Sequence, residues 1–154
     1  MGPLDNQVIE LPGRNRLIDE LLRAGLEVAQ PLRDCGVDLI VYSGPLVPFM
    51  ARPIQMKAAS GMSFSLDRKY AKFPGLILAY VWHLAEEKKT ETYALTYGEA
   101  LQVAKRMKWT DTNSWTQKGN YTNNQPGIRL LRLLKRYKID SPEKWRTKIT
   151  ERME

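Results

Sequence analysis

The sequence has a single cysteine, Cys35, and a single histidine, His83, among its 154 residues. One cysteine cannot form an internal disulfide, and the two residues are too few for a zinc site built from cysteine and histidine. No run of about 18 apolar residues occurs, and the N-terminal stretch MGPLDNQVIELPG lacks a basic segment leading into an apolar one. These absences argue against structural zinc, a transmembrane helix and a signal peptide, so we expect a cytoplasmic protein.

The composition is that of a folded domain, with 43% hydrophobic and 27% charged residues. A chain of this length buries most of its apolar surface in one domain and is short for two. We therefore expect residues 1–154 to form a single domain.

Positive charge is concentrated in the C-terminal third. The chain carries a formal net charge of +7, but residues 105–148 alone hold twelve lysines and arginines against three acids, a surplus of nine. A polyanion is the simplest partner for this segment, and nucleic acid is favoured over a membrane because no strongly apolar amphipathic anchor accompanies the charge. The alternative is a solvated basic surface that keeps a small protein soluble.

Hydrophobic periodicity predicts an α/β fold. A helix is expected from Pro12 to Gly25, and Thr96 and Glu99 have the spacing of a capping box before a second helix. Residues 64–73 fit either a short helix or an irregular crossing, and 110–125 read as a polar loop. The expected strands are 26–31, 37–43, 49–60, 75–84 and 92–96, and further helices are expected at 126–139 and from Ser141 onward. This order predicts a mixed central sheet of about five strands flanked by helices.

Two of these strands carry polar residues at alternating positions. Asp38 lies at the start of an otherwise apolar strand, where a carboxylate is costly unless it is paired or binds a metal. Gln55 and Lys57 share the opposite face from the apolar residues of their strand. Adjacent strands would then present an acid, an amide oxygen and an ammonium to one cleft, as phosphodiester hydrolysis requires.

The segments GVDLIVY and RPIQMKAAS, preceded by a helix and the strand LEVAQP, resemble the PD-(D/E)xK nuclease superfamily, which has the restriction-endonuclease-like fold. The core of that family is a helix with a glutamate, a strand with an aspartate, and a strand with an acid, one spacer and a lysine. The resemblance covers about residues 12–96 and leaves the basic, helical part at about 97–154 outside it.

The resemblance implies roles for particular residues. Asp38 matches the metal-binding aspartate, Lys57 matches the catalytic lysine, and the carbonyl of Met56 corresponds to the backbone metal ligand. Gln55 stands where the family usually has an acid, although methyl-directed restriction endonucleases and some resolvase-like members use a Gln-x-Lys version. Glu20 is expected to be the helix acid that orients a water or a second metal, with Asn15 and Glu10 as the alternatives.

The function implied by the resemblance is a DNA endonuclease that depends on Mg²⁺ or Mn²⁺ and works as a homodimer. RNA is left open as a substrate. The first alternative is a catalytically silent nuclease-fold module that binds nucleic acid. The second is a basic interaction protein whose acidic partner is not a nucleic acid.

Several residues outside the motif are expected to contact nucleic acid. Arg68 and Lys69 follow the motif strand, although a solvated helix face is an equal explanation for them. Aromatic and basic residues of the polar loop suit contacts in a groove, and arginines recur every three to four residues along one side of the basic helix. These loop and helix residues are Lys118, Tyr121, Arg129, Arg132 and Arg136.

Overall fold

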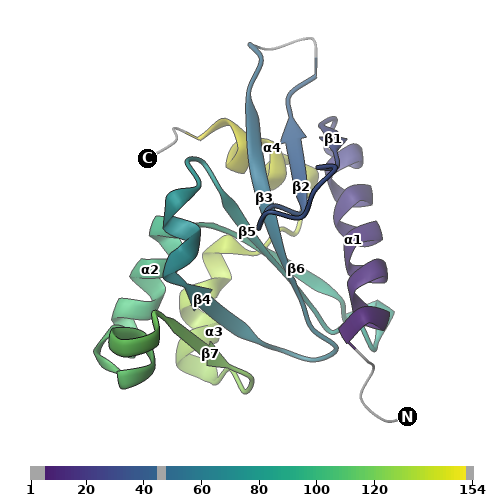
Figure 1. Cartoon of the computed structure of the whole chain (residues 1–154). Coiled ribbons are helices and arrows are strands. Elements are labelled where there is room, and N and C mark those ends of the chain that lie inside the picture. Colours follow the sequence, from purple (N-terminus) through teal and green to yellow (C-terminus); the bar gives the residue numbers. More distant parts are fainter. Residues whose placement is uncertain (1–5, 45–47, 152–154) are drawn as a thin grey trace.

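The computed structural model describes residues 6–44 and 48–151, so the first five residues of the N-terminal stretch considered above lie outside it. Its centre is a mixed five-stranded sheet in the order β1-β2-β3-β5-β6 (Figure 1). The pairing between β3 and β5 is parallel, and the other three pairings are antiparallel. The strands are β1 (Glu27–Ala29), β2 (Leu39–Tyr42), β3 (Ala51–Ala58), β5 (Ile77–Trp82) and β6 (Glu91–Thr96). A separate antiparallel pair joins β4 (Phe64–Asp67) to β7 (Asn120–Asn123).

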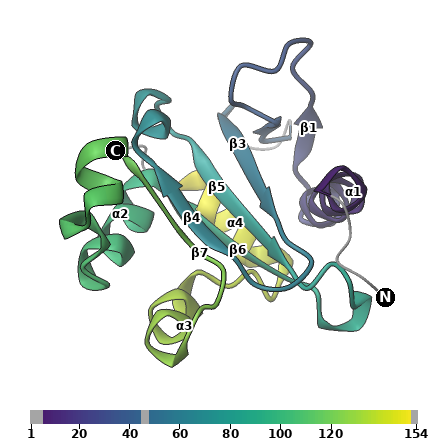
Figure 2. The ribbon, with the colours of Figure 1, turned by 60° about the horizontal axis from the view of Figure 1, so that its bottom comes forward.

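Each face of the central sheet is covered by a different layer (Figure 2). Helices α1 (Asn6–Arg23) and α4 (Pro142–Thr150) pack on one face, over a core that is aliphatic apart from Trp145 and includes Leu17 and Leu21. Helices α2 (Tyr97–Arg106) and α3 (Ile128–Leu134) pack with the β4–β7 pair on the other face, over a core rich in aromatic residues. The short helical turns are η1 (Arg68–Lys72), η2 (Glu87–Lys89), η3 (Trp109–Asp111), η4 (Ser114–Lys118) and η5 (Lys135–Tyr137).

The α/β class, the mixed sheet and its five strands are confirmed. The capping box is also present, because Glu99 N donates to Thr96 Oγ1 at 3.1 Å and Thr96 N donates to Glu99 Oε2 at 2.8 Å. The expected start of the first helix is wrong. Pro12 lies inside α1, which begins at Asn6, and burial of Ile9 against the fold stabilises the extra turns.

Three other segments also differ from expectation. Residues 64–67 form β4 and are followed by η1, in place of one helix or crossing. Four residues of the expected polar loop form β7, because they pair with β4. The basic helix is shorter than expected, with α3 ending at Leu134 and continuing as the 3-10 turn η5. In the first two cases a pairing partner distant in sequence decides the structure.

The C-terminal residues complete both layers. Trp145 and Ile149 of α4 are fully buried on one face, and Leu130 and Leu134 of α3 are fully buried on the other. No helix in 6–44 or 48–151 is long and apolar enough to span a bilayer.

Candidate active site

The register between β2 and β3 brings Asp38 beside Gln55. Leu39, the first residue of β2, pairs with Ile54, so Asp38, just before β2, comes next to the residue that follows Ile54 on β3. The backbone N–H of Asp38 donates to the carbonyl of Ile54 at 2.9 Å. In return, the backbone N–H of Met56 donates to Asp38 Oδ2 at 2.7 Å. Asp38 is therefore held against β3 by two hydrogen bonds, one donated by its backbone N–H and one accepted by its carboxylate.

Alternation along β3 separates its polar and apolar side chains. Ile54 and Met56 are buried in the aliphatic core under α1 and α4, whereas Gln55 and Lys57 lie half-buried on the other face. On that face the aromatic core covers β5 and β6, through residues such as Leu78. Gln55 and Lys57 are not part of that core. They line a cavity on this side of β3 instead.

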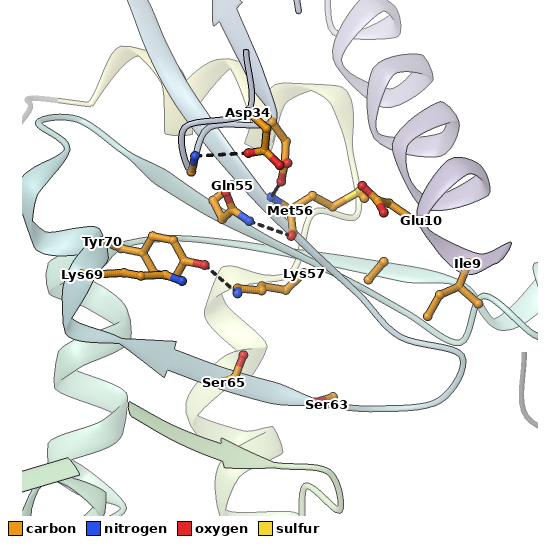
Figure 3. A pocket seen from close by; sticks show the side chains of 13 residues that line it. Ile9, Glu10, Asp34, Gln55, Met56, Lys57, Ser63, Ser65, Lys69 and Tyr70 are labelled. Atoms are coloured by element: carbon orange, nitrogen blue, oxygen red, sulfur yellow. Dashed lines mark hydrogen bonds between the residues drawn. The ribbon is translucent and has the colours of Figure 1, made fainter. Parts of the chain in front are cut away.

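The cavity measures about 520 Å³ and lies between β3, the start of α1, and β4 with η1 (Figure 3). Asp38, Gln55, Met56 and Lys57 all line it, so the residues that the motif singled out are brought together. The other lining residues are Ile9, Glu10, Asp34, Gly36, Ala58, Ser63, Ser65, Lys69 and Tyr70.

Helix α1 supplies Glu10 to this cavity. The helix lies close to β3 at Gly13, where an added Cβ would come within 3.1 Å of Ala58 Cβ and 3.4 Å of Met56 Sδ. Glu10 is exposed and accepts a hydrogen bond from Arg14 Nη2 at 3.0 Å. Because α1 begins before Pro12, Glu10 lies on the helix itself rather than in a preceding turn.

Lys57 is held by Tyr70. Its Nζ lies 2.7 Å from the tyrosine hydroxyl oxygen, and Figure 3 shows the two side chains pointing toward each other from β3 and η1. Tyr70 is only 3% exposed. The turn that carries it is capped by Asp67, whose Oδ1 accepts from the backbone N–H of Lys69 at 2.9 Å. A buried ring on a capped turn gives the ammonium group a fixed partner.

Gln55 has an acceptor oxygen without a partner. Its Oε1 is buried and accepts no hydrogen bond, while its Nε2 lies 3.5 Å from the carbonyl oxygen of Met56. Buried oxygens without donors are rare in folded proteins. A hard cation beside this amide would satisfy the oxygen, so Gln55, the Met56 carbonyl and the Asp38 carboxylate fit an oxygen-ligand metal site.

Burial raises the pKa of the Asp38 carboxyl above its ordinary value. The hydrogen bond from the Met56 backbone and the positive charge of Arg14 oppose this rise, and the neighbouring carboxylates Asp34 and Glu10 add to it. A divalent cation at the carboxylate would favour its charged form. Within residues 6–44 and 48–151, no group of three or more His, Cys, Asp or Glu side chains is arranged to hold a metal.

Glu20 does not lie at this cavity. Its Oε1 accepts from Arg16 Nε at 3.1 Å and from Thr92 Oγ1 at 2.9 Å, and its Oε2 accepts from Trp145 Nε1 at 3.0 Å. These contacts tie α1 to β6 and α4, so Glu20 has a structural position. Asn15 lines a different pocket, formed with Asp19 and neighbouring residues. Of the three helix residues considered, the fold brings only Glu10 to the cavity.

The expected nucleic-acid contacts are spread over the fold. Lys69 lines the cavity, whereas the guanidinium of Arg68 lies over the Trp115 ring, 5.6 Å from its centroid. Lys118 is exposed at the end of η4, and the Tyr121 ring stacks on Trp109 with centroids 4.6 Å apart.

Arg129, Arg132 and Arg136 all lie on α3 and η5, away from the cavity. Arg129 Nη2 donates to the carbonyl of Arg106 at 2.8 Å. Arg132 and Arg136 line another groove.

Sequence patterns did not select Asp34, Ser65 or Tyr70. Asp34 comes to the cavity in a turn, where its Oδ1 accepts from the backbone N–H of Gly36 at 3.3 Å. Ser65 lies between the buried Phe64 and Leu66 on β4. Predicting a strand at 64–67 would have placed Ser65 on the opposite face from these two residues. For Tyr70 no local signal exists, because its contact with Lys57 depends on the tertiary fold.

Comparisons with models of known protein families, with curated protein sequences and with solved structures give no match for this chain. The residues and their geometry therefore carry the functional argument.

Proposed function

We propose that this protein is a metal-dependent endonuclease that hydrolyses phosphodiester bonds in DNA. The observation that carries the proposal is the convergence of Asp38, Gln55 and Lys57 on one cavity, with Glu10 at its edge. This set repeats the helix acid, strand aspartate and strand lysine of the PD-(D/E)xK nucleases. The mixed sheet between helical layers supports a restriction-endonuclease-like fold as part of the same proposal.

Three oxygens would hold Mg²⁺ or Mn²⁺: the Asp38 carboxylate, the Gln55 amide and the Met56 carbonyl. An amide rotation at Gln55 would turn Oε1 toward the carbonyl that Nε2 now faces at 3.5 Å. A cation there would supply Lewis-acid polarisation of the scissile phosphate. Glu10 would orient a water at the edge of the site.

Lys57 would position the attacking water and offset the negative charge that develops on the phosphate. Its hydrogen bond to Tyr70 fixes the direction of the ammonium group, which reduces the cost of reaching the reactive geometry. On the β4 side of the cavity, the Ser65 hydroxyl could donate a hydrogen bond to a phosphate oxygen, whereas the Ser63 hydroxyl already donates to Asn124 Oδ1 at 2.8 Å. We include a homodimer in the proposal, since two sites would address two strands.

The test is nicking or linearisation of plasmid DNA by the purified chain with Mg²⁺ or Mn²⁺. Lys57→Ala and Asp38→Ala should abolish cleavage, and EDTA should do the same. Lys89→Ala is the matched control, because this exposed lysine pairs with Glu86 away from the cavity and its loss changes the charge equally. Cleavage that survives Lys57→Ala would mean that another group, or a contaminant, cuts the DNA.

A second candidate is the catalytically silent nucleic-acid-binding module. It is favoured by the neutral Gln55 and by the absence, in the described ranges, of a carboxylate cluster arranged for a metal. Binding of Mn²⁺ followed by electron paramagnetic resonance separates the two candidates. The endonuclease should bind Mn²⁺ and lose it in Asp38→Ala. No Mn²⁺ binding and no cleavage of plasmid, branched DNA or RNA, with salt-sensitive DNA binding retained, would favour the silent module.

A further inference from the structure

A groove between α2 and the segment α3–η5 gathers three arginines. It measures about 410 Å³ and opens on the layer that covers the aromatic core. Arg106 comes from the end of α2, Arg132 from α3 and Arg136 from η5, and all three are exposed. The remaining lining residues are Gln102, Val103, Leu133 and Tyr137.

Among the described residues, no carboxylate lines the groove. Across the part of the chain that the structure describes, no ion pair involves Arg106, Arg132 or Arg136. Other cations of the fold do have acidic partners, such as Arg23 with Asp19 at 2.8 Å. Glu99, an acid on the same helix as Arg106, is already bound by Lys148 at 2.8 and 2.9 Å. The positive charge of the groove is therefore uncompensated.

The walls of the groove are held in place by contacts outside the three guanidinium groups. Arg129 Nη2 donates to the carbonyl of Arg106 at 2.8 Å, which ties α3 to the end of α2. Beneath the groove, Val103, Leu130 and Leu134 belong to the buried aromatic core. The Arg136 guanidinium lies over the Tyr137 ring, 5.6 Å from its centroid. The spacing of the two helices is thus set by the buried core and by the Arg129 hydrogen bond, and not by the guanidinium groups of Arg106, Arg132 and Arg136.

The groove and the candidate active site are on different parts of the molecule. No residue lines both. Helix α1, which supplies Glu10, lies on the right of Figures 1 and 2, and α2 lies on the left. Ser65 of β4 and Ser63 just before it face the cavity, while Phe64 and Leu66 pack into the core shared with α2 and α3. A phosphate seated in the groove is therefore a different phosphate from the one in the cavity.

We propose that this groove is a second phosphate-binding site, occupied by phosphodiester groups of a nucleic-acid segment outside the cavity. Three like charges around one groove repel one another, and a bound anion relieves that repulsion. Guanidinium groups match phosphate oxygens with two parallel N–H donors each, and Gln102 adds an amide donor. A free phosphate or pyrophosphate has the same chemistry and is the other source that the test distinguishes. The inference rests on the proposed function in taking nucleic acid as the ligand. It concerns binding, which is measured in EDTA, so its outcome does not depend on whether the chain cleaves DNA.

The experiment compares three variants of the full chain in EDTA. The groove variant is Arg106→Gln, Arg132→Gln and Arg136→Gln together. The matched control is Lys105→Gln, Lys108→Gln and Lys135→Gln, which removes the same charge from exposed positions on α2, just after α2 and on η5. The third variant changes the three groove arginines to lysine, which keeps the charge and removes the guanidinium geometry. The probes are a labelled duplex oligonucleotide, measured by fluorescence anisotropy over a salt series, and sodium pyrophosphate, measured by thermal shift.

We expect the groove variant to lose about tenfold or more in oligonucleotide affinity, and the slope of log affinity against log salt to fall by about two to three. The control should keep both, and the lysine variant should lose affinity with a smaller change in slope. Loss of pyrophosphate stabilisation by the groove variant, with oligonucleotide binding intact, would support the site with free phosphate as its source. Equal losses in the groove variant and the control, or full retention by both, would overturn the proposal. If the triple variant melts early, Arg132→Gln alone gives the same comparison.

Discussion

Lys57 Nζ and the hydroxyl oxygen of Tyr70 lie 2.7 Å apart, although the two residues come from a strand and a 3-10 turn. The hydrogen bond joins a cation to a neutral group whose ring is almost fully buried. Hydrogen bonds to charged groups contribute about 1.5–3 kcal/mol. The orientation of the lysine therefore depends on a residue outside the Gln-x-Lys motif.

Tyr70→Phe should lower the cleavage rate by about 10- to 100-fold if the whole hydrogen bond acts on the transition state. The ring keeps its packing, so the melting temperature should change little. Tyr80→Phe is the control: Tyr80 pairs with Lys57 in the β3–β5 register, but its buried hydroxyl donates to the Ser65 carbonyl at 2.7 Å and not to the lysine, whose Nζ is bound by Tyr70. It should reduce the free energy of unfolding by about 1–2 kcal/mol and leave cleavage per folded molecule unchanged. Equal cleavage rates for Tyr70→Phe and the unmodified chain would show that the Tyr70 hydroxyl has no role in cleavage.

Glu10→Gln and Glu20→Gln should have opposite consequences. Glu10→Gln should reduce cleavage by about 10- to 100-fold, as loss of a group that supports a metal site does, with little effect on stability because its pair with Arg14 is exposed. Glu20→Gln should lower the free energy of unfolding by about 1–3 kcal/mol, since Trp145 and Thr92 share its carboxylate. Plasmid cleavage and urea denaturation check the two effects. Full activity in Glu10→Gln and none in folded Glu20→Gln would reverse the assignment.

Asp38→Asn tests the effect of burial on that carboxyl. Because burial raises the pKa of Asp38 above 3.8, the folded chain holds the proton more tightly than the unfolded chain does. The contribution of Asp38 to the free energy of unfolding therefore declines as the pH rises from about 3.8 through the raised pKa. In EDTA at pH 7, Asp38→Asn should melt at the same temperature as the unmodified chain or higher, since asparagine can still accept from Met56 N.

The same variant tests metal binding. At a Mn²⁺ concentration about 100 times the dissociation constant, the unmodified chain should gain about 2.7 kcal/mol of stability. Asp38→Asn should gain less, because it lacks the charged ligand. Thermal melts at pH 3.5, 5 and 7, with and without Mn²⁺, measure both effects. A lower melting temperature for Asp38→Asn at every pH in EDTA would show that the carboxylate stabilises the fold instead.

Gly119→Ala should destabilise the chain by about 1–2 kcal/mol. Gly119 has a φ of +76°, which costs an L-residue about that much. An added Cβ would also come within 2.8 Å of Arg68 Nε, so that side chain must move from its place over Trp115. Gly61→Ala is the matched control, since no atom within 4 Å would meet its Cβ. Urea denaturation should give equal midpoints for Gly61→Ala and the unmodified chain, and an unchanged midpoint for Gly119→Ala would contradict the argument.

The local sequence pattern predicted secondary structure correctly where a segment's own residues decide its structure. Short apolar segments bounded by turn residues predicted the five strands of the central sheet, and the capping box predicted the start of α2. Side-chain alternation along a strand predicted that Gln55 and Lys57 would share a face. It also predicted that Asp38 would share their cleft, and all three line one cavity.

The local sequence pattern failed to predict the structure where contacts with residues distant in the sequence decide it. Pro12 has the chemistry of a helix start, yet burial of Ile9 carries α1 through it to Asn6. As a result, the acid of α1 that lines the cavity is Glu10. Glu20 instead accepts a hydrogen bond from Trp145, which is 125 residues away in the sequence. Likewise, β4 and β7 are strands because they pair with each other.

The composition and the strand periods of this chain were therefore enough for its α/β class and for the prediction that Asp38, Gln55 and Lys57 meet, because residues two apart on a strand share a face and paired strands lie side by side. The choice of helix acid, the Tyr70 partner of Lys57 and the separation of the arginine groove from the cavity needed the tertiary structure. Each of these depends on how α1, η1 and α3 pack against the sheet, and packing joins residues that no local period relates.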